Sequence, residues 1–175
     1  IGWSVGFLLI LGECFAFGSW PTLSWRHLLI AFMISVWAVR LAGYLLSRTI
    51  GRTQEDFRYQ KLRRGWGSHE LLGSFLQVYM LQGAIMLLLS LPIVLAFSRD
   101  WPSDSYTIWD VLGFAVWLTG LVFETVSDYQ VSEFCKHKQP NQILTSGLFR
   151  YSRHPNYFGE SCVWFGVAVV TAPLT

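Results

Sequence analysis

The stretch GLFRYSRHPNYFGE, residues 147–160, crowds polar side chains into a short segment that runs directly into apolar sequence. Pro155 suits the first position of a helix, because proline lacks the N–H that the first helical turn leaves unpaired. Asn156 and Glu160 are then four residues apart and share one helical face. The stretch therefore predicts a polar loop at the edge of a membrane, followed by a helix that enters it.

The polar groups of this stretch suit an anionic ligand. A helix N-terminus offers free N–H groups to an anion, and the guanidinium groups of Arg150 and Arg153 match phosphate or carboxylate. His154 can bind phosphate or relay a proton, and Tyr157 lies in the same first turn. Arg153 and His154 could instead contact lipid phosphates, with Glu160 paired to a basic loop residue. The complete set of groups favours a binding site.

The composition indicates an integral membrane protein. The 175 residues are 53% hydrophobic and 17% aromatic, and 14% are charged, against about 25% in soluble domains. The formal net charge of +2 is too small to indicate nucleic-acid binding. The three cysteines show no paired spacing, so we expect neither a disulfide nor a metal site.

Five apolar segments can be interpreted as membrane helices, at roughly 1–18, 28–46, 74–98, 109–128 and 157–172. A membrane helix needs about 20 residues to cross about 30 Å of hydrocarbon. The first and last segments are short, which fits a chain truncated at both ends. We therefore predict an all-α, multi-pass bundle of about five membrane helices, forming one membrane domain over 1–175.

Basic residues are concentrated in two of the connecting segments. The segment after the second helix carries six, and the segment before the fifth carries four. The segment after the third helix has Arg99 beside Asp100 and Asp104. Because cytosolic loops are enriched in Lys and Arg, we expect the two basic segments to face the cytosol: Arg48, Arg52, Arg58, Lys61, Arg63 and Arg64, and Lys136, Lys138, Arg150 and Arg153.

Several ionisable residues fall inside the predicted spans, Glu13, Arg40, Glu124 and Asp128 among them. Such groups usually pair or face a cavity, because burying a charge in lipid costs several kcal/mol. Glu13 and Arg40 are candidates for a pair between helices. Glu124 and Asp128 are four residues apart on one face, so their like charges need a cation, a donor-rich ligand or a proton. We assign these two acids to the binding site.

The stretch 147–160 resembles the C-terminal signature of the steroid 5-alpha-reductase-like superfamily. That signature is Gly-Leu-Phe/Trp, a short spacer and His-Pro-Asn-Tyr-x-Gly-Glu/Asp. The segment FETVSDYQVSEF, residues 123–134, also resembles the family. EDFRYQ at 55–60 resembles a branch of uncharacterised multi-pass membrane proteins, as do five residues of the second helix, Trp37, Arg40, Leu41, Tyr44 and Arg48.

This resemblance implies a membrane-embedded reductase that binds NADPH from the cytosolic side and reduces the enone double bond of a lipid or sterol-like substrate. Asp128, Asn156 and Glu160 match residues that hold the cofactor, and Glu124 is a weaker fourth. Basic residues, among them Lys136, would meet the phosphates. The expected partners are membrane lipids and an apolar small-molecule substrate. The full cofactor-binding set is Glu124, Asp128, Arg150, Arg153, His154, Asn156, Tyr157 and Glu160.

Two departures and two alternatives accompany the resemblance. Steroid-reducing members carry an early glutamate, for which Glu13 is a candidate, and a tyrosine where this chain has Trp37. The sequence also ends before the family's final basic and tyrosine-containing segment, so the catalytic proton donor is unassigned. Membrane methyltransferases that use S-adenosylmethionine share an Arg-His-Pro-x-Tyr-x-Gly motif, but Asn156 and Glu160 favour a reductase. A third interpretation is a catalytically inactive accessory subunit of a larger membrane complex.

Overall fold

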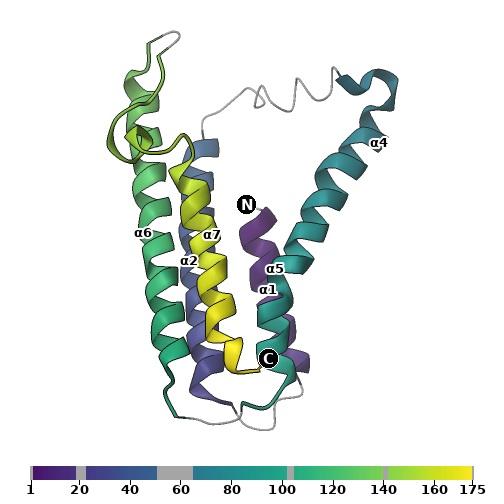
Figure 1. Ribbon diagram of the computed structural model, residues 1–175. Helices are drawn as coiled ribbons and strands as arrows, with labels where there is room; N and C mark the ends of the chain where they lie inside the picture. Colours follow the sequence, from purple (N-terminus) through teal and green to yellow (C-terminus); the bar gives the residue numbers. More distant parts are fainter. Residues whose placement is uncertain (1, 19–22, 51–64, 102–104, 140–141, 175) are drawn as a thin grey trace.

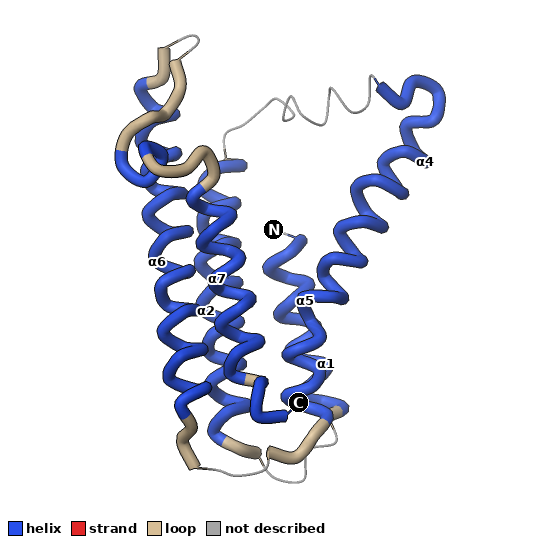
Figure 2. The backbone as a smooth tube through the Cα atoms, in the orientation of Figure 1, coloured by secondary structure: helices blue, strands red, loops and turns tan. Residues whose placement is uncertain are grey.

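The computed structural model describes residues 2–18, 23–50, 65–101, 105–139 and 142–174, and these residues form helices and loops without a strand (Figures 1 and 2). A π-helical turn, Phe75–Met80, joins α4 to α5, so the two form one continuous rod. Three short 3₁₀ turns lie at Gly67–His69, Gly147–Arg150 (η3) and Ala172–Leu174. The α-helices are α1 (Gly2–Phe17), α2 (Trp25–Thr49), α4 (Glu70–Ser74), α5 (Leu81–Ser98), α6 (Ile108–His137) and α7 (Pro155–Val170).

The prediction of an all-α integral membrane protein is confirmed. Within the described residues, three helices are long and apolar enough to cross a membrane: Trp25–Thr49, Glu70–Ser98 and Ile108–His137. The helices α1 and α7 have 16 residues each, or about 24 Å at 1.5 Å per residue. These are the two segments that looked short in the sequence. Large apolar side chains such as Leu87 and Leu88 of α5 point outward, as a lipid environment requires.

Two of the helices are longer than the apolar pattern predicts. The helix α2 begins at Trp25 because Ser24 caps it, with the Ser24 backbone N–H donating to Nδ1 of His27 at 3.0 Å. The helix α6 continues nine residues beyond 128, to His137. Its last turns are polar, and Glu133 and Lys136 pair along the surface there. Hydrophobicity alone could not show this extension, because it leaves the apolar zone.

The tightest packing in the bundle joins α6 to the antiparallel α7 (Figure 1). A Cβ atom added to Gly120 would lie 2.5 Å from the Gly159 carbonyl oxygen, and one added to Gly159 would lie 2.8 Å from the Glu124 nitrogen. Gly113 and Gly166 form a second contact of this kind two turns away. The two backbones therefore touch directly, as small residues allow between membrane helices.

An aromatic cluster fills the centre of the bundle where α1, α2 and α7 meet. The Phe7 ring centroid lies 4.2 Å from that of Trp164 and 5.6 Å from that of Trp37, and the two tryptophan rings are 4.9 Å apart. All three side chains are buried. Trp37 also contacts the polar layer described below, so the apolar core adjoins it directly.

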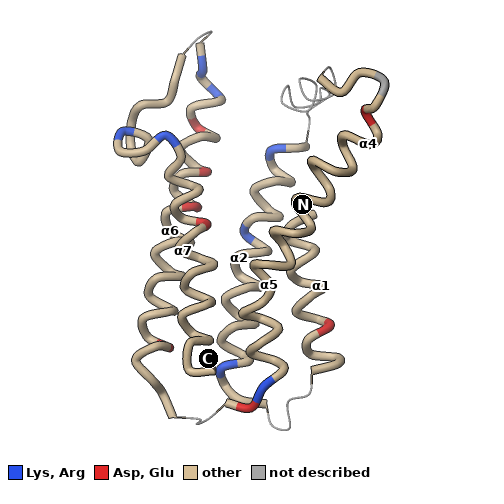
Figure 3. The backbone as a smooth tube through the Cα atoms, turned by 45° about the vertical axis from the view of Figure 1, so that its right-hand side comes forward, with Lys and Arg blue, Asp and Glu red and all other residues tan. Residues whose placement is uncertain are grey.

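The ends of the bundle differ in charge (Figure 3). Arg48 lies in the last turn of α2, Lys136 in the last turn of α6 and Arg150 in η3, all at one end. The opposite end carries Arg26 at the start of α2 and Arg99 after α5. This arrangement is the one the positive-inside rule expects, although the basic segment 51–64 lies outside the described residues. That the first end faces the cytosol stays a prediction.

Candidate functional site

Two arginines, the buried Arg26 and the partly buried Arg40, tie α2 to α6 at different depths. The helices run in the same direction (Figure 1), and Arg26 bonds Asp110, 84 positions along the chain. Arg40 meets Glu124 at the same offset of 84 positions. Fourteen residues separate the two arginines, which corresponds to about 21 Å along a helix. Because the two helices run parallel, the difference in residue number between facing positions is constant. A single packing register of α2 on α6 therefore forms both clusters.

The Arg40 cluster consists of Trp37, Arg40, Glu124 and Asp128. Arg40 Nη2 lies 2.7 Å from Glu124 Oε1, and Arg40 Nη1 lies 2.6 Å from Asp128 Oδ2. The indole N–H of Trp37 donates to Glu124 Oε2 at 3.1 Å. The side chains of Arg40, Glu124 and Asp128 are 15%, 7% and 14% exposed. Arg40 is thus the cation that the two acids were expected to need.

The expected pairing of Arg40 with Glu13 is wrong. Glu13 lies on the surface of α1, whereas the Arg40 guanidinium faces α6. The physical reason is that two acids one helical turn apart attract a planar, forked cation more strongly than a single acid does.

The helix α7 adds polar groups to this cluster. The close contact at Gly159 brings the first turns of α7 against Glu124. Glu160 lies near enough to Arg40 and Asp128 to interact with them electrostatically. Asn156, on the same face of α7, is likewise partly buried, whereas Tyr157 is 55% exposed. The structure therefore gathers Glu124, Asp128 and Glu160 and leaves Tyr157 at the rim.

The predicted cofactor-binding set contains no residue of α2, although α2 supplies one wall of the site. Trp37, Arg40, Tyr44 and Arg48 recur at intervals of three or four residues and so share a face. The Tyr44 hydroxyl is within hydrogen-bonding reach of Arg48 and of Ser132 on α6. This periodicity of polar and aromatic residues on an otherwise apolar helix is the signal that could have identified them.

The loop that leads to α7 is fastened to α6 by Gln130. The Leu148 backbone N–H donates to Gln130 Oε1 at 3.0 Å. Gly147 has φ of +62°, which favours glycine, and a Cβ atom there would collide with the Gln130 amide. Gln130 was not among the expected site residues, and it determines where the motif loop lies.

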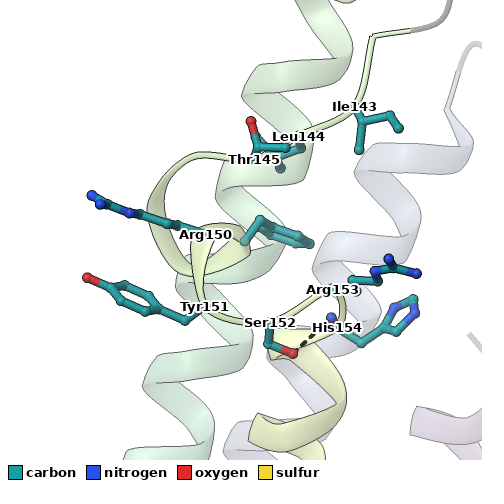
Figure 4. Close-up of a pocket in the computed structure, with 9 residues that line it drawn as sticks. Ile143, Leu144, Thr145, Arg150, Tyr151, Ser152, Arg153 and His154 are labelled. Carbon is teal, nitrogen blue, oxygen red and sulfur yellow. Dashed lines mark hydrogen bonds between the residues drawn. The ribbon is translucent and has the colours of Figure 1, made fainter.

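The motif loop presents its basic groups in two directions. It lines an open pocket of about 770 Å³ formed by residues 143–145 and 149–154. Figure 4 shows Arg150 and Tyr151 pointing to one side of the loop, and Arg153 and His154 pointing to the other. The His154 ring stacks on Tyr157 with centroids 4.9 Å apart. The structure therefore does not bring Arg150 and Arg153 together.

Neither arginine of the loop is neutralised within the described part of the chain. No ion pair or hydrogen bond joins Arg150 or Arg153 to another described side chain. The described residues also hold no group of three potential metal ligands, and the three cysteines are unpaired. The site thus offers buried carboxylates and an amide inside the bundle, with an unpaired guanidinium and an imidazole at its mouth.

Comparison with known proteins identifies the family. A family model described as a protein of unknown function, DUF1295, matches residues 1–175. The chain belongs to the DUF1295 family. This DUF1295 chain is also 22% identical, over 160 residues, to an uncharacterised protein of Schizosaccharomyces pombe. That match covers 79% of this chain and 46% of the relative.

Named enzymes match a shorter part of this DUF1295 chain. Human 3-oxo-5-alpha-steroid 4-dehydrogenase 1 is 33% identical over 76 residues, which is 43% of this chain and 28% of the enzyme. The steroid 5-alpha-reductase DET2 of Arabidopsis thaliana is 30% identical over 77 residues, 43% of this chain and 29% of the enzyme. The chain thus spans less than half the length of these relatives. No solved structure matches. The resemblance to the steroid 5-alpha-reductase-like superfamily is confirmed.

Proposed function

We propose that this DUF1295 protein is a membrane reductase that uses NADPH to reduce the carbon–carbon double bond of an apolar, lipid-like enone. The observation that carries the proposal is the Arg40 cluster, which faces the Asn156–Glu160 surface of α7 inside a membrane bundle. The similarity to steroid 5-alpha-reductases over part of the chain supports it.

The residues present fit a dinucleotide that enters from the mouth of the bundle. Arg153, His154 and the N-terminus of α7 would bind phosphate oxygens. Asn156 offers both a donor and an acceptor, and Asp128 offers an acceptor for hydroxyl or amide groups. When bound, NADPH would supply a hydride to the substrate.

Two predicted cofactor-binding residues, Tyr157 and Arg150, have smaller roles in this proposal, and so does Lys136, which was expected near the phosphates. Tyr157 would keep the His154 ring oriented by stacking. Lys136 is already paired with Glu133 at the surface. Arg150 points to the opposite side of the loop from Arg153 (Figure 4), so we assign the main phosphate contact to Arg153.

An apolar substrate fits the layer next to the carboxylates. Trp37 donates its N–H to Glu124 while its ring packs against Phe7 and Trp164. The polar cluster and the aromatic cluster therefore share one side chain, and both lie within the membrane bundle. A hydride donor held at the polar layer would lie close to an apolar molecule in the hydrocarbon layer, as reduction of a membrane-dissolved substrate requires.

The direct test is calorimetric titration of NADPH into the full-length protein in detergent. Asn156→Ala and Arg153→Ala should each weaken binding by roughly tenfold to a hundredfold, because a hydrogen bond to a charged group contributes about 1.5–3 kcal/mol. Lys138→Ala removes an exposed positive charge just beyond α6 and serves as the control, with unchanged affinity.

The same titration separates the alternatives. Binding of S-adenosylmethionine in place of NADPH would indicate a methyltransferase. Binding of neither compound by the wild type would refute the reductase proposal and favour an accessory subunit. Unchanged NADPH affinity in both variants would remove the cofactor from this motif.

A further inference from the structure

We propose that Arg40 and Trp37 are positioning residues. Together they fix the side chain of Glu124, and Arg40, held between the two acids, orients Asp128 to accept a hydrogen bond from the ligand. The inference rests on the proposed function and deepens it, because it gives the two acids different roles. Within the site, Glu124 would orient its neighbours and Asp128 would bind.

The pattern of ion pairs and hydrogen bonds distinguishes the two acids. Both oxygens of Glu124 are engaged, Oε1 by Arg40 and Oε2 by Trp37. Asp128 uses Oδ2 for Arg40, and among the described residues nothing donates to its Oδ1. A carboxylate accepts through both oxygens. Asp128 therefore keeps one oxygen available to a ligand, whereas both oxygens of Glu124 are occupied. Asp128 also lies nearer the mouth of the bundle, one helical turn beyond Glu124.

The geometry of Arg40 explains how both acids are held. Its two terminal nitrogens lie in one plane and contact one acid each, at 2.7 and 2.6 Å. This fork sets the separation and orientation of the two carboxylates at once. A lysine ammonium has the same charge but lacks the planar fork. The role therefore depends on the shape of the guanidinium as well as on its charge.

Other contacts already perform the task of anchoring α2. The Arg26–Asp110 pair joins α2 to α6 at the opposite end. Trp37 packs into the aromatic core independently of the ion pairs. A fold held at these points does not need a second arginine, which favours a positioning role for Arg40.

The test compares folding stability with NADPH affinity in three variants of the full-length protein in detergent. Arg40→Gln leaves two buried carboxylates unpaired and should lower both. Arg40→Gln combined with Glu124→Gln removes one of these charges, so stability should recover. NADPH affinity should stay at least about tenfold below wild type, the loss expected for one charge-assisted hydrogen bond. Arg40→Lys should fold like wild type and bind NADPH with intermediate affinity.

Matched controls make the result decisive. Arg26→Lys is the same conservative change in the opposite cluster, and its folded fraction should bind NADPH like wild type. Wild-type affinity in Arg40→Lys, or in the double variant once its stability has recovered, would overturn the positioning role. If both glutamine variants fail to fold, the affinity of Arg40→Lys decides. Absence of NADPH binding by the wild type would instead refute the proposed function, and this inference with it.

Discussion

The helix α2 carries a buried arginine, Arg26, and a partly buried one, Arg40, which meet α6 in the same register but in different chemical settings. Arg26 forms a two-point pair with Asp110, at 2.9 and 3.0 Å, and these side chains are 1% and 4% exposed. The guanidinium also lies 4.8 Å from the ring of Trp25 and 5.0 Å from that of Trp101. One charge meets one opposite charge, and aromatic rings close the site.

The Arg40 cluster is neither balanced nor closed. One guanidinium faces Glu124 and Asp128, with Glu160 close enough to add a third negative charge. Arg48 interacts with Asp128 from the next turns of α2, but its side chain is only partly buried. In the first kind of cluster each charge is already matched, and removing one partner is costly to the fold. The second kind, with surplus acceptors and partial access, is suited to a ligand.

Asp110→Ala should cause the largest loss of stability. It leaves Arg26 buried without its partner, and breaking a buried ion pair costs about 3–5 kcal/mol. The Thr107 backbone N–H, which donates to Asp110 Oδ2 at 2.7 Å, also loses its acceptor. Unfolding followed by circular dichroism in detergent measures the effect. Glu133→Ala breaks the exposed pair with Lys136 and serves as the control, with little change in stability. Equal losses of stability in the two variants would show that the buried Arg26–Asp110 pair contributes no more to the fold than an exposed pair.

Gly120→Ala should give the next largest effect. The added methyl group would meet the Gly159 carbonyl oxygen and the Val163 nitrogen, and overpacking of this kind costs about 1–3 kcal/mol. Gly83→Ala on α5 is the control, because no atom lies within 4 Å of its Cβ position. The same unfolding assay applies, and Gly120→Ala should also lower NADPH affinity by separating α7 from Glu124. A variant as stable as wild type would show that the two helices are not held by backbone contact.

Gln130→Ala should have a smaller effect, confined to the ligand end. It removes the acceptor for the Leu148 N–H, a loss of about 0.5–1.5 kcal/mol. Gln130→Glu keeps an acceptor and should retain more of the stability. Hydrogen exchange at Leu148 reports the effect directly. Faster exchange in both variants would mean that the amide group as a whole, and not the accepting oxygen, holds the loop.

Arg150→Ala should produce the smallest change. Its side chain is exposed and points away from Arg153 (Figure 4), and an exposed charge contributes about 0.2–1 kcal/mol. NADPH affinity should fall less than about fivefold, clearly less than for Arg153→Ala. If the two alanine variants lose affinity equally in the titration, the loop closes around the phosphates and the two sides of the pocket are not distinct in the complex.

Much of the fold could be predicted because it depends on local chemistry. The apolar segments near 28–46, 74–98 and 109–128 correspond to α2, to the α4–α5 rod and to the membrane part of α6. A helix that crosses the lipid requires a long run of apolar residues, and such a run can be recognised in the sequence without knowledge of the structure. Pro155 likewise marked the start of α7 correctly, since proline favours the first helical position. The polar end of α6 was missed because a helix outside the hydrocarbon needs no apolar pattern.

The order of residues is enough to indicate the helical membrane fold, the family signature and the need of Glu124 and Asp128 for a cation, a donor-rich ligand or a proton. The packing of the helices was needed to show that Arg40, more than 80 positions away, is the group that meets them, and that Arg150 and Arg153 point apart. Charge pairing depends on which helices are neighbours and in which register they pack. For α2 and α6 that register is the common offset of 84 positions, which brings Arg26 to Asp110 and Arg40 to Glu124.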